Sequence, residues 1–417
     1  MHIEDPARLR EVVSNAVSKA RITDVHTHIF PPTFGDLFLW GIDELLTYHY
    51  LVAETMRVVD IPYSRFWAMS KREQADLIWK ALFIERTPCS EACRGVLTVL
   101  SRLGLDVKSR DLESYRQFFR DITVEDYVDR VFELEGIDKI VMTNDPFNPR
   151  ERKMWLDGKR RDERFLAALR LDVLLNSWPV ACQRLREWGY DVSEDLSADT
   201  LKGVRRFLED WIGRMKAVYM AVSLPYDFNI PEDSPRARFI EDCVIPVSRE
   251  LGVPFAMMIG VDRQVNPGLG DAGDAVGRMN IRVIKYLAAR YPENKFMVTL
   301  LSRENQHELS VMARKFRNLM IFGCWWFLNN PSLVEEITRM RVELLGTSFI
   351  PQHSDARVFD QLIYKWEHSK ATIAKVLQDK YLDLLETGWV PEEEEIERDA
   401  ARLFGDNFRD FALRTEI

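Results

Sequence analysis

Two stretches near opposite ends of the chain decide the fold: RITDVHTHIFP at residues 21–31 and TSFIPQHSDAR at residues 347–357. Each is a short apolar run that ends in polar side chains, His26 and His28 in the first and Asp355 in the second. Over three hundred residues separate the two runs. In a closed barrel of eight parallel strands, the first and eighth strands are neighbours and their carboxyl ends share one pocket. The two stretches therefore predict such a barrel, with a site at that pocket.

Six further apolar runs lie between these ends, and most are separated by amphipathic stretches. Near-continuous apolarity bounded by polar turns is typical of parallel strands buried on both faces. The eight predicted strands are ITDVHTHIF (22–30), KIVMTNDP (139–146), FLAALRLD (165–172), AVYMAVSLP (217–225), PFAMMIGV (254–261), KFMVTLLS (295–302), LMIFGCWW (319–326) and TSFIPQHSD (347–355). The periodicity of FLAALRLD fits a helix equally well. Alternation of strand and helix indicates a single α/β domain over residues 1–417, built as a distorted (β/α)8 TIM barrel.

Two connections are too long for simple crossovers. Residues 31–137, between the first and second strands, carry several helical patterns, and we expect a large helical insertion over the mouth of the barrel. Residues 173–216 predict a second, smaller helical insertion. Exposed aromatic side chains in the first insertion would suit a homo-oligomer.

The composition is that of an ordinary globular protein, with 46% hydrophobic and 29% charged residues. A net charge of -9 disfavours nucleic acid and anionic membranes as partners, since both select basic surfaces. Local arginines or a metal must therefore attract any anionic ligand. No apolar run approaches membrane-spanning length, and the first residues lack the apolar segment of a signal peptide. Five scattered cysteines are interpreted as reduced thiols, which favours a cytoplasmic protein.

A metal site is the first functional prediction. His26 and His28 lie two residues apart at a strand end, so both point to one face, and two neutral imidazoles can bind one divalent cation. The alternative is a buried, hydrogen-bonded histidine pair. Asp355 could be a third ligand, a base, or the N-cap of the helix predicted to follow it. Arg357 suggests an anion or a polyol as ligand, or else it is a surface side chain on the first helical turn.

Other polar and aromatic residues at strand ends have two interpretations each. Arg170, on an apolar strand, needs either Asp172 or an anionic ligand as its partner. His353 is a packed core histidine or a partner of the metal ligands. Of Trp325 and Trp326, we expect one to face the site.

The run TYHY in the first insertion, with Tyr48, His49 and Tyr50, is either packing or a source of a phenol that moves a proton. LGDAGD (269–274) lacks the lysine and spacing of a phosphate loop and predicts an active-site loop without an assigned role. The roles of Arg263 and Arg303 are left open.

The two histidines and the distant aspartate resemble the amidohydrolase superfamily. A fuller set of motifs resembles the uronate isomerases over nearly the whole chain: HTHIFPP, DELLTYHYLVAE, FWAMSKREQADLIWKALF, TNDP, CWWF and HSDAR. This resemblance implies an aldose–ketose isomerase that interconverts D-glucuronate and D-fructuronate, and D-galacturonate and D-tagaturonate. It implies proton transfer from carbon 2 to carbon 1 through a cis-enediol at one metal ion.

The resemblance also implies residue roles. Asp355 would be the base, Tyr50 would bond the carbon-1 carbonyl and help move the proton, and Arg357 would bind the hydroxyls at carbons 2 and 3. His49 and Arg170 would complete substrate binding, together with the indoles of Trp325 and Trp326.

The chain departs from the hydrolases of the superfamily, which usually carry further ligand histidines at strands five and six. Here those strands read FAMMIGV and FMVTLLSREN, so His26, His28 and Asp355 remain as the only plain ligands. We expect one metal ion, with zinc as the default for such a set. The competing hypotheses are a mononuclear metal-dependent hydrolase and a non-catalytic barrel that binds sugar acids.

Overall fold

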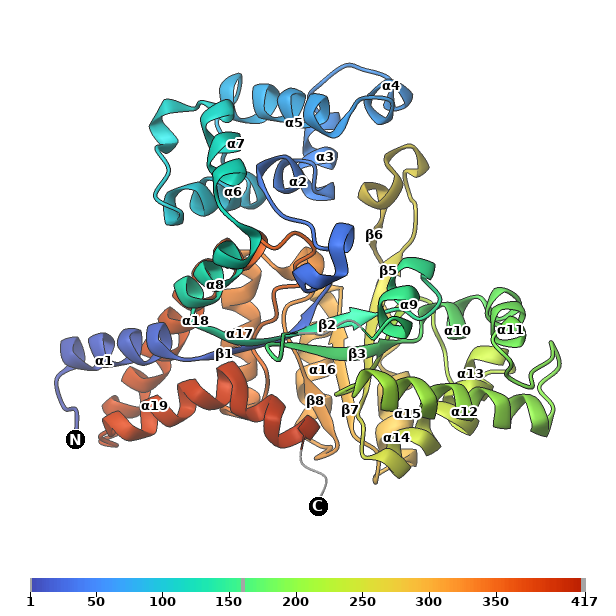
Figure 1. Cartoon of the computed structure of the whole chain (residues 1–417). Helices are drawn as coiled ribbons and strands as arrows, with labels where there is room; N and C mark the ends of the chain where they lie inside the picture. Colours follow the sequence, from blue (N-terminus) through green and yellow to red (C-terminus); the bar gives the residue numbers. More distant parts are fainter. Residues whose placement is uncertain (1, 159–161, 414–417) are drawn as a thin grey trace.

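The computed structural model describes residues 2–158 and 162–413 (Figure 1). Its centre is one curled sheet in which parallel strands follow the order β1-β2-β3-β4-β5-β7-β8. The strands are β1 (Ile22–Thr27), β2 (Ile137–Asn144), β3 (Phe165–Arg170), β4 (Met220–Pro225), β5 (Phe255–Asp262), β6 (Ala275–Val276), β7 (Phe296–Leu300) and β8 (Leu319–Ile321). Seven of the predicted strands are thereby confirmed, including the ambiguous run at 165–172. The short β6 was not predicted and pairs antiparallel with β5.

The two faces of the sheet are both apolar, as parallel strands covered by helices require. Alternate residues such as Val141, Ala168 and Ala221 form a small cluster on the concave face. Their neighbours, such as Met142 and Leu169, join the main core beneath the helices. The concave-face cluster also holds larger side chains such as Phe322, so side chains of mixed size fill the curled sheet.

The prediction of a regular eighth strand at residues 347–355 is wrong. Residues 347–355 make only an isolated parallel bridge, between Ile350 and Phe322. Backbone hydrogen bonds still attach this segment on both sides. The N–H of Ile350 donates to Ile321, the N–H of Asp355 donates to His26 at 3.1 Å, and the N–H of His28 donates to Ala356 at 2.7 Å. Pro351 has no N–H to offer a ladder, which favours the irregular backbone.

The chain between β1 and β2 is helical and lies above the sheet in Figure 1. Its elements are η1 (Pro32–Leu37), α2 (Ile42–Leu46), α3 (His49–Met56), α4 (Tyr63–Trp67), α5 (Lys71–Trp79), η2 (Lys80–Ile84), α6 (Glu91–Arg102), η3 (Val107–Ser109), α7 (Leu112–Asp121) and α8 (Val124–Glu135). Ser70 and Ser90 cap α5 and α6 with their hydroxyls, which satisfies free N–H groups at those helix starts.

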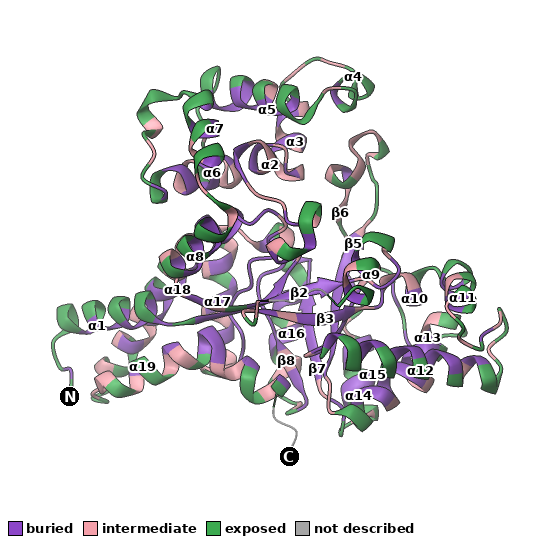
Figure 2. Ribbon diagram, viewed as in Figure 1, coloured by how far each residue is buried: buried purple, intermediate pink, exposed green. Residues whose placement is uncertain are grey.

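The remaining helices surround the sheet. They are α1 (Pro6–Lys19), α9 (Pro149–Leu156), α10 (Asp172–Asn176), α11 (Trp178–Glu187), α12 (Ala198–Met215), α13 (Pro235–Phe239), η4 (Ile240–Val244), α14 (Ile245–Leu251), η5 (Pro267–Gly273), α15 (Arg282–Arg290), η6 (Arg303–Asn305), α16 (Gln306–Ala313), η7 (Trp326–Leu328), α17 (Pro331–Leu345), α18 (Gln361–Glu386), α19 (Glu393–Ala401), η8 (Arg402–Asp406) and η9 (Arg409–Leu413). Figure 2 shows the strands buried and the outward helix faces exposed.

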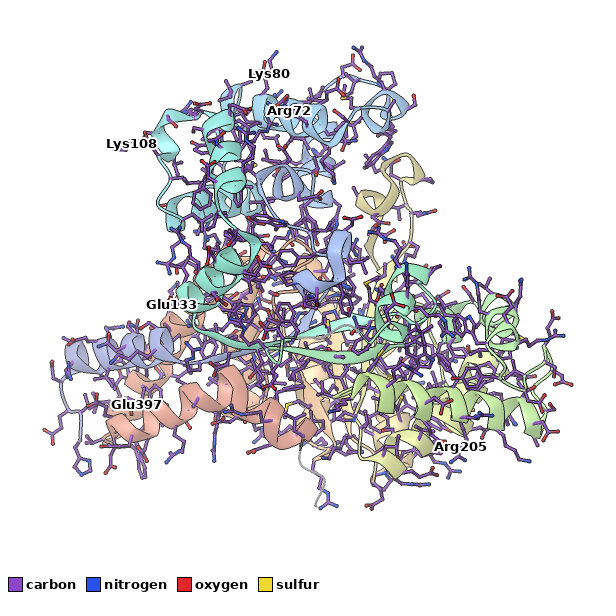
Figure 3. The ribbon with its side chains drawn as sticks, viewed as in Figure 1. Arg72, Lys80, Lys108, Glu133, Arg205 and Glu397 are labelled. Atoms are coloured by element: carbon purple, nitrogen blue, oxygen red, sulfur yellow. The ribbon has the colours of Figure 1, made fainter. Side chains whose placement is uncertain are left out.

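Charged side chains gather on the outside of this architecture. Figure 3 labels Arg72, Lys80, Lys108, Glu133 and Glu397, all of which are exposed. None of the helices in the described residues is both long and apolar enough to cross a bilayer.

Candidate active site

Three side chains from the two ends of the chain meet at the carboxyl end of β1. The Nε2 atoms of His26 and His28 lie 3.5 Å and 3.4 Å from Oδ1 of Asp355. One ligand atom from each residue lies within 4.8 Å of the other two. Within the described residues, Nε2 of His26 and Oδ1 of Asp355 are buried and make no hydrogen bond. Unpaired buried polar atoms that face one another fit the donor set of a divalent metal ion.

The charges of this trio suit a metal as well. Burial holds the pKa of His28 at about 4, so its imidazole is neutral at pH 7 and has a lone pair for a ligand. Burial raises the pKa of Asp355, but the two histidines beside it lower the pKa more, and the net value is well below the ordinary one. Asp355 is therefore an ionised carboxylate.

The backbone at Asp355 is held in an unusual conformation. Its φ is +51°, in the left-handed region that few residues with side chains adopt. The preceding residue, Ser354, is fixed from both sides: its N–H donates to Asp24 Oδ1 at 3.0 Å, and its carbonyl accepts from Lys365 Nζ at 2.6 Å. Asp24 also accepts from the indole N–H of Trp366 at 2.9 Å. These buried contacts supply the restraint that a strained residue at a functional site needs.

Asp355 is not a helix N-cap, and Arg357 is not on a first helical turn. The following helix, α18, begins at Gln361 with Asp360 at its N-cap position. Both residues instead lie in an irregular segment next to the site. The N-cap role for Asp355 and the helical position for Arg357 are therefore excluded.

The trio lies at the floor of a cavity of ≈ 80 Å³. Its walls come from β3, β4, β5, η7 and the segments after them, and the lining residues are His26, His28, Tyr48, His49, Arg170, Ser223, Val261, Arg263, Asp271, Asp274, Trp325, Trp326, Asp355 and Arg357. A second cavity of ≈ 590 Å³ adjoins it, because Tyr48, His49, Asp271 and Arg357 line both. Eight of the nine predicted site residues therefore lie together, and the ninth, Tyr50, lines neither cavity.

The two predicted arginines face the cavity with acidic partners. Arg170 forms a two-pronged ion pair with Asp172, at 2.9 Å for each bond. Arg357 lies 3.3 Å from Asp271, whose side chain is 79% exposed. An exposed ion pair of that kind contributes little, so Arg357 can exchange Asp271 for a ligand at small cost.

The aromatic wall uses both tryptophans, where only one was expected to face the site. Trp325 is buried, and Trp326 stands with its ring centroid 5.6 Å from that of His49. The indole N–H of Trp326 is buried and has no hydrogen-bond partner within the described residues. The same is true of Nε2 of His49. Burial also lowers the pKa of His49 to about 3, so this imidazole is neutral. Each group is free to hydrogen-bond a polar ligand.

Tyr50 lies behind the cavity wall. Its ring centroid is 4.9 Å from that of Tyr48, and Tyr48 is the phenol that lines both cavities. In the described structure, the hydroxyl of Tyr50 is buried without a hydrogen-bond partner, and burial holds its pKa well above the ordinary value. α3 begins at His49, so Tyr50 lies in the first turn of the helix, whereas Tyr48 is the N-cap residue and has an extended backbone.

Three other residues considered from the sequence pack against neighbours or form ion pairs within the protein. His353 is buried against His26, with 5.2 Å between ring centroids, and neither ring nitrogen has a partner within the described chain. Arg303 forms an ion pair with Glu336 at 3.0 Å on the surface. Arg263 pairs with Asp274 at 2.7 Å at the edge of the cavity.

Neither a protein-family model nor a curated protein matches this chain. Among solved structures, a uronate isomerase from Bacillus halodurans C-125 is 59% identical, with a TM-score of 0.98 over 99% of this chain and 98% of the other. This chain belongs to the uronate isomerase family. A uronate isomerase from Thermotoga maritima (16% identical, TM-score 0.75, 97% of each chain) shares the fold. So does a glucuronate isomerase from Caulobacter crescentus (15% identical, TM-score 0.80, 99% of this chain and 95% of the other).

Six lining residues of the cavity in this uronate isomerase had no role assigned from the sequence: Tyr48, Ser223, Val261, Arg263, Asp271 and Asp274. Ser223 lies within β4, and its position two residues after Ala221 on the concave face is a usable signal. Asp271 and Asp274 belong to the loop predicted to reach the site, but loop side chains have no periodicity to orient them. The sequence names Tyr48 only as part of the TYHY run, because periodicity does not fix where α3 begins.

Proposed function

We propose that this uronate isomerase interconverts D-glucuronate and D-fructuronate, and D-galacturonate and D-tagaturonate. The observation that carries the proposal is the convergence of two imidazoles, a carboxylate and two guanidinium groups on one cavity. A sugar acid needs cationic partners for its carboxylate and hydrogen-bonding partners for its hydroxyls, and this lining offers both. The relative at 59% identity bears the name of this activity.

We assign His26, His28 and Asp355 as the ligands of one divalent metal ion, with zinc as the default for two imidazoles and a carboxylate. The assignment is supported by the unpaired buried atoms Nε2 of His26 and Oδ1 of Asp355. When bound, such an ion supplies a Lewis acid that orients the oxygens of the substrate.

Asp355 is proposed as the group that moves the proton between the two carbons. Its carboxylate takes the proton from carbon 2, and the electron pair of that C–H bond forms the double bond of the enediol. Tyr50, the phenol that the family resemblance implies, would give its proton to the carbonyl oxygen at carbon 1 and recover one from the hydroxyl at carbon 2 as the new ketone forms. In this structure the neighbouring Tyr48 lines the cavity and Tyr50 does not. Asp355 then returns its proton to carbon 1.

Arg357 is proposed to bind the oxygens at carbons 2 and 3 and to stabilise the negative charge that develops there. Arg170 and His49 would hold the rest of the open-chain sugar, with Trp325 and Trp326 as its apolar wall. The unpaired N–H of Trp326 and the unpaired nitrogen of His49 support this placement.

The site rests on a finer interpretation of the fold, also proposed here. The curled sheet is a distorted (β/α)8 barrel closed by residues 347–356, with residues 31–137 and 173–216 as insertions. The backbone bonds from Ile350 to Ile321 and from Asp355 to His26 support that closure. A cytoplasmic location and a homo-oligomeric state complete the proposal.

The test is turnover of D-glucuronate and D-galacturonate in ²H₂O by enzyme of measured metal content. Ketose should form, and carbon 1 of the product should carry solvent deuterium in part, because Asp355 can exchange its proton during transfer. Asp355→Asn should lower kcat at least about 10³-fold, since it removes the base, while Asp106→Asn, on the surface, should leave kcat unchanged. Hydrolysis of an amide or lactone without any isomerisation would refute the proposal.

The choice between the two phenols needs a separate experiment. Tyr50→Phe should lower kcat about 10²-fold, within the usual range for a proton-transfer group. Tyr48→Phe should raise KM more than it lowers kcat, because Tyr48 lines the cavity without a proton-transfer role. The reverse pattern would assign the proton transfer to Tyr48.

A further inference from the structure

A hydroxyl group stands behind each of the two histidines. Nδ1 of His26 lies 3.3 Å from the phenol oxygen of Tyr219, the residue just before β4. The same hydroxyl donates its hydrogen to the carbonyl of Val25 at 2.7 Å. Tyr219 is buried, so its oxygen has no access to water.

The arrangement is repeated at the second histidine with a different residue. Nδ1 of His28 lies 3.0 Å from Oγ1 of Thr143, near the end of β2. Thr143 donates to the carbonyl of Thr27 at 3.0 Å and is buried as well. Two side chains from different strands therefore make the same pair of contacts, each to a ring nitrogen and to a carbonyl of β1.

A hydroxyl has one hydrogen to give, and this fixes the direction of both contacts. Since Tyr219 and Thr143 donate to backbone carbonyls, each oxygen can only accept from the ring nitrogen. In the neutral form that binds a metal, the hydrogen of each imidazole must then be on Nδ1, and the lone pair must be on Nε2. These are the two Nε2 atoms that lie 3.5 Å and 3.4 Å from Oδ1 of Asp355.

We propose that Tyr219 and Thr143 are positioning residues that hold His26 and His28 in the Nδ1–H tautomer, with both Nε2 lone pairs directed at one point. A neutral histidine side chain in water prefers its hydrogen on Nε2, so these contacts reverse the preference of both rings. The inference rests on the proposed metal site, and it adds the groups that prepare the ligands before a metal arrives.

The opposite assignment leaves unfavourable contacts. With the hydrogen on Nε2, Tyr219 and Thr143 would have to donate to the rings, and the carbonyls of Val25 and Thr27 would lose the hydroxyl hydrogens that they accept. Nε2 of His26 makes no hydrogen bond within the described residues, which agrees with a lone pair there.

The first experiment reads the tautomers directly, in metal-free protein. Histidine ¹⁵N shifts and two-bond couplings should place the hydrogen on Nδ1 for both His26 and His28. Thr143→Val should shift the tautomer equilibrium of His28 toward the Nε2–H form and leave that of His26 unchanged. Tyr219→Phe should shift the equilibrium of His26 in the same direction and leave that of His28 unchanged. Thr143→Ser keeps a hydroxyl and should keep the tautomer.

The second experiment measures zinc affinity by competition with a chelator. Thr143→Val and Tyr219→Phe should each weaken zinc binding about 10- to 100-fold. The matched control is Thr299→Val, a buried threonine of β7 whose hydroxyl has no partner in the described structure, and its zinc affinity should stay within about twofold of the wild type.

The outcomes separate this inference from the proposed function. Unchanged tautomers in Thr143→Val and Tyr219→Phe, with affinities equal to that of Thr299→Val, would overturn the positioning role even in an active isomerase. A wild-type protein that binds no metal would instead overturn the proposed site, while the ¹⁵N spectra would still decide how the two rings are held.

Discussion

Gly323 is the position where one added carbon should disturb the site most, without touching a ligand directly. It follows β8 with φ at +69°, and its backbone is held by bonds to the carbonyl of Ile350 and from the guanidinium of Arg341, at 2.9 Å each. A Cβ built on it would lie 1.9 Å from Cδ2 and 2.6 Å from Nε2 of His353. His353 is fully buried and packs against His26, so its ring has little room to move away.

The expected cost of Gly323→Ala has two parts. The left-handed backbone costs an alanine about 1 kcal/mol, and overpacking of a buried site costs about 1–3 kcal/mol more. We expect a loss of roughly 2–4 kcal/mol in the free energy of unfolding. Displacement of His353 toward His26 should also weaken zinc binding.

Urea unfolding of four variants measures this: Gly323→Ala, Gly252→Ala, His353→Ala and the double variant Gly323→Ala/His353→Ala. Gly252→Ala is the matched control: its φ is +65° and no atom lies within 4 Å of the added Cβ, so only the backbone cost of about 1 kcal/mol applies. The double variant Gly323→Ala/His353→Ala relieves the clash and should be more stable than the sum of the two single losses, with a coupling above about 1 kcal/mol. Equal losses in Gly323→Ala and Gly252→Ala, or strict additivity in the double variant, would refute the reasoning.

Three more predictions concern other parts of the chain. Burial raises the pKa of Glu135 from 4.5 to about 7, so the stability that its protonated form gives below pH 4.5 is lost as the pH rises to 7. Glu135→Gln should abolish this loss, worth up to about 3 kcal/mol, in unfolding curves at pH 4.5 and 8; parallel pH profiles for both proteins would contradict it. Asp24→Asn should destabilise by about 2–4 kcal/mol and Trp366→Phe by only about 1, because Asp24 accepts from three N–H groups and Trp366 supplies one; a larger effect of Trp366→Phe would be evidence against that network. Trp67→Phe removes the 2.9 Å bond to the carbonyl of Gly268 and should speed amide exchange of residues 264–275 about fivefold, and unchanged exchange would mean that this bond does not hold the loop.

The buried strands were predictable because their residues face apolar surroundings on both sides, which leaves a continuous signal in the sequence. The meeting of His26 and His28 with Asp355 followed from topology alone, since the first and last strands of a closed barrel are neighbours. Neither prediction required knowledge of loops or insertions.

The details that escaped prediction depend on local backbone geometry. The eighth segment lost its regular pairing because Pro351 has no N–H and Asp355 adopts a positive φ, neither of which alters an apolar pattern. The order of Tyr48 and Tyr50 around the cavity depends on where α3 begins, a boundary that periodicity does not fix. Thr143 and Tyr219 act through hydrogen-bond direction, which only coordinates reveal.

The origin of the proposed ligands at both ends of the chain has a consequence for biosynthesis. A ribosome that adds 5–20 residues per second needs roughly 15–65 s to travel from His28 to Asp355. During that interval the two imidazoles exist without their carboxylate, and the segment that fixes Asp355 has not been made. The complete site can therefore receive its metal only after residues 347–357 have been translated and have reached β1, so the full ligand set cannot form while the first insertion is being made.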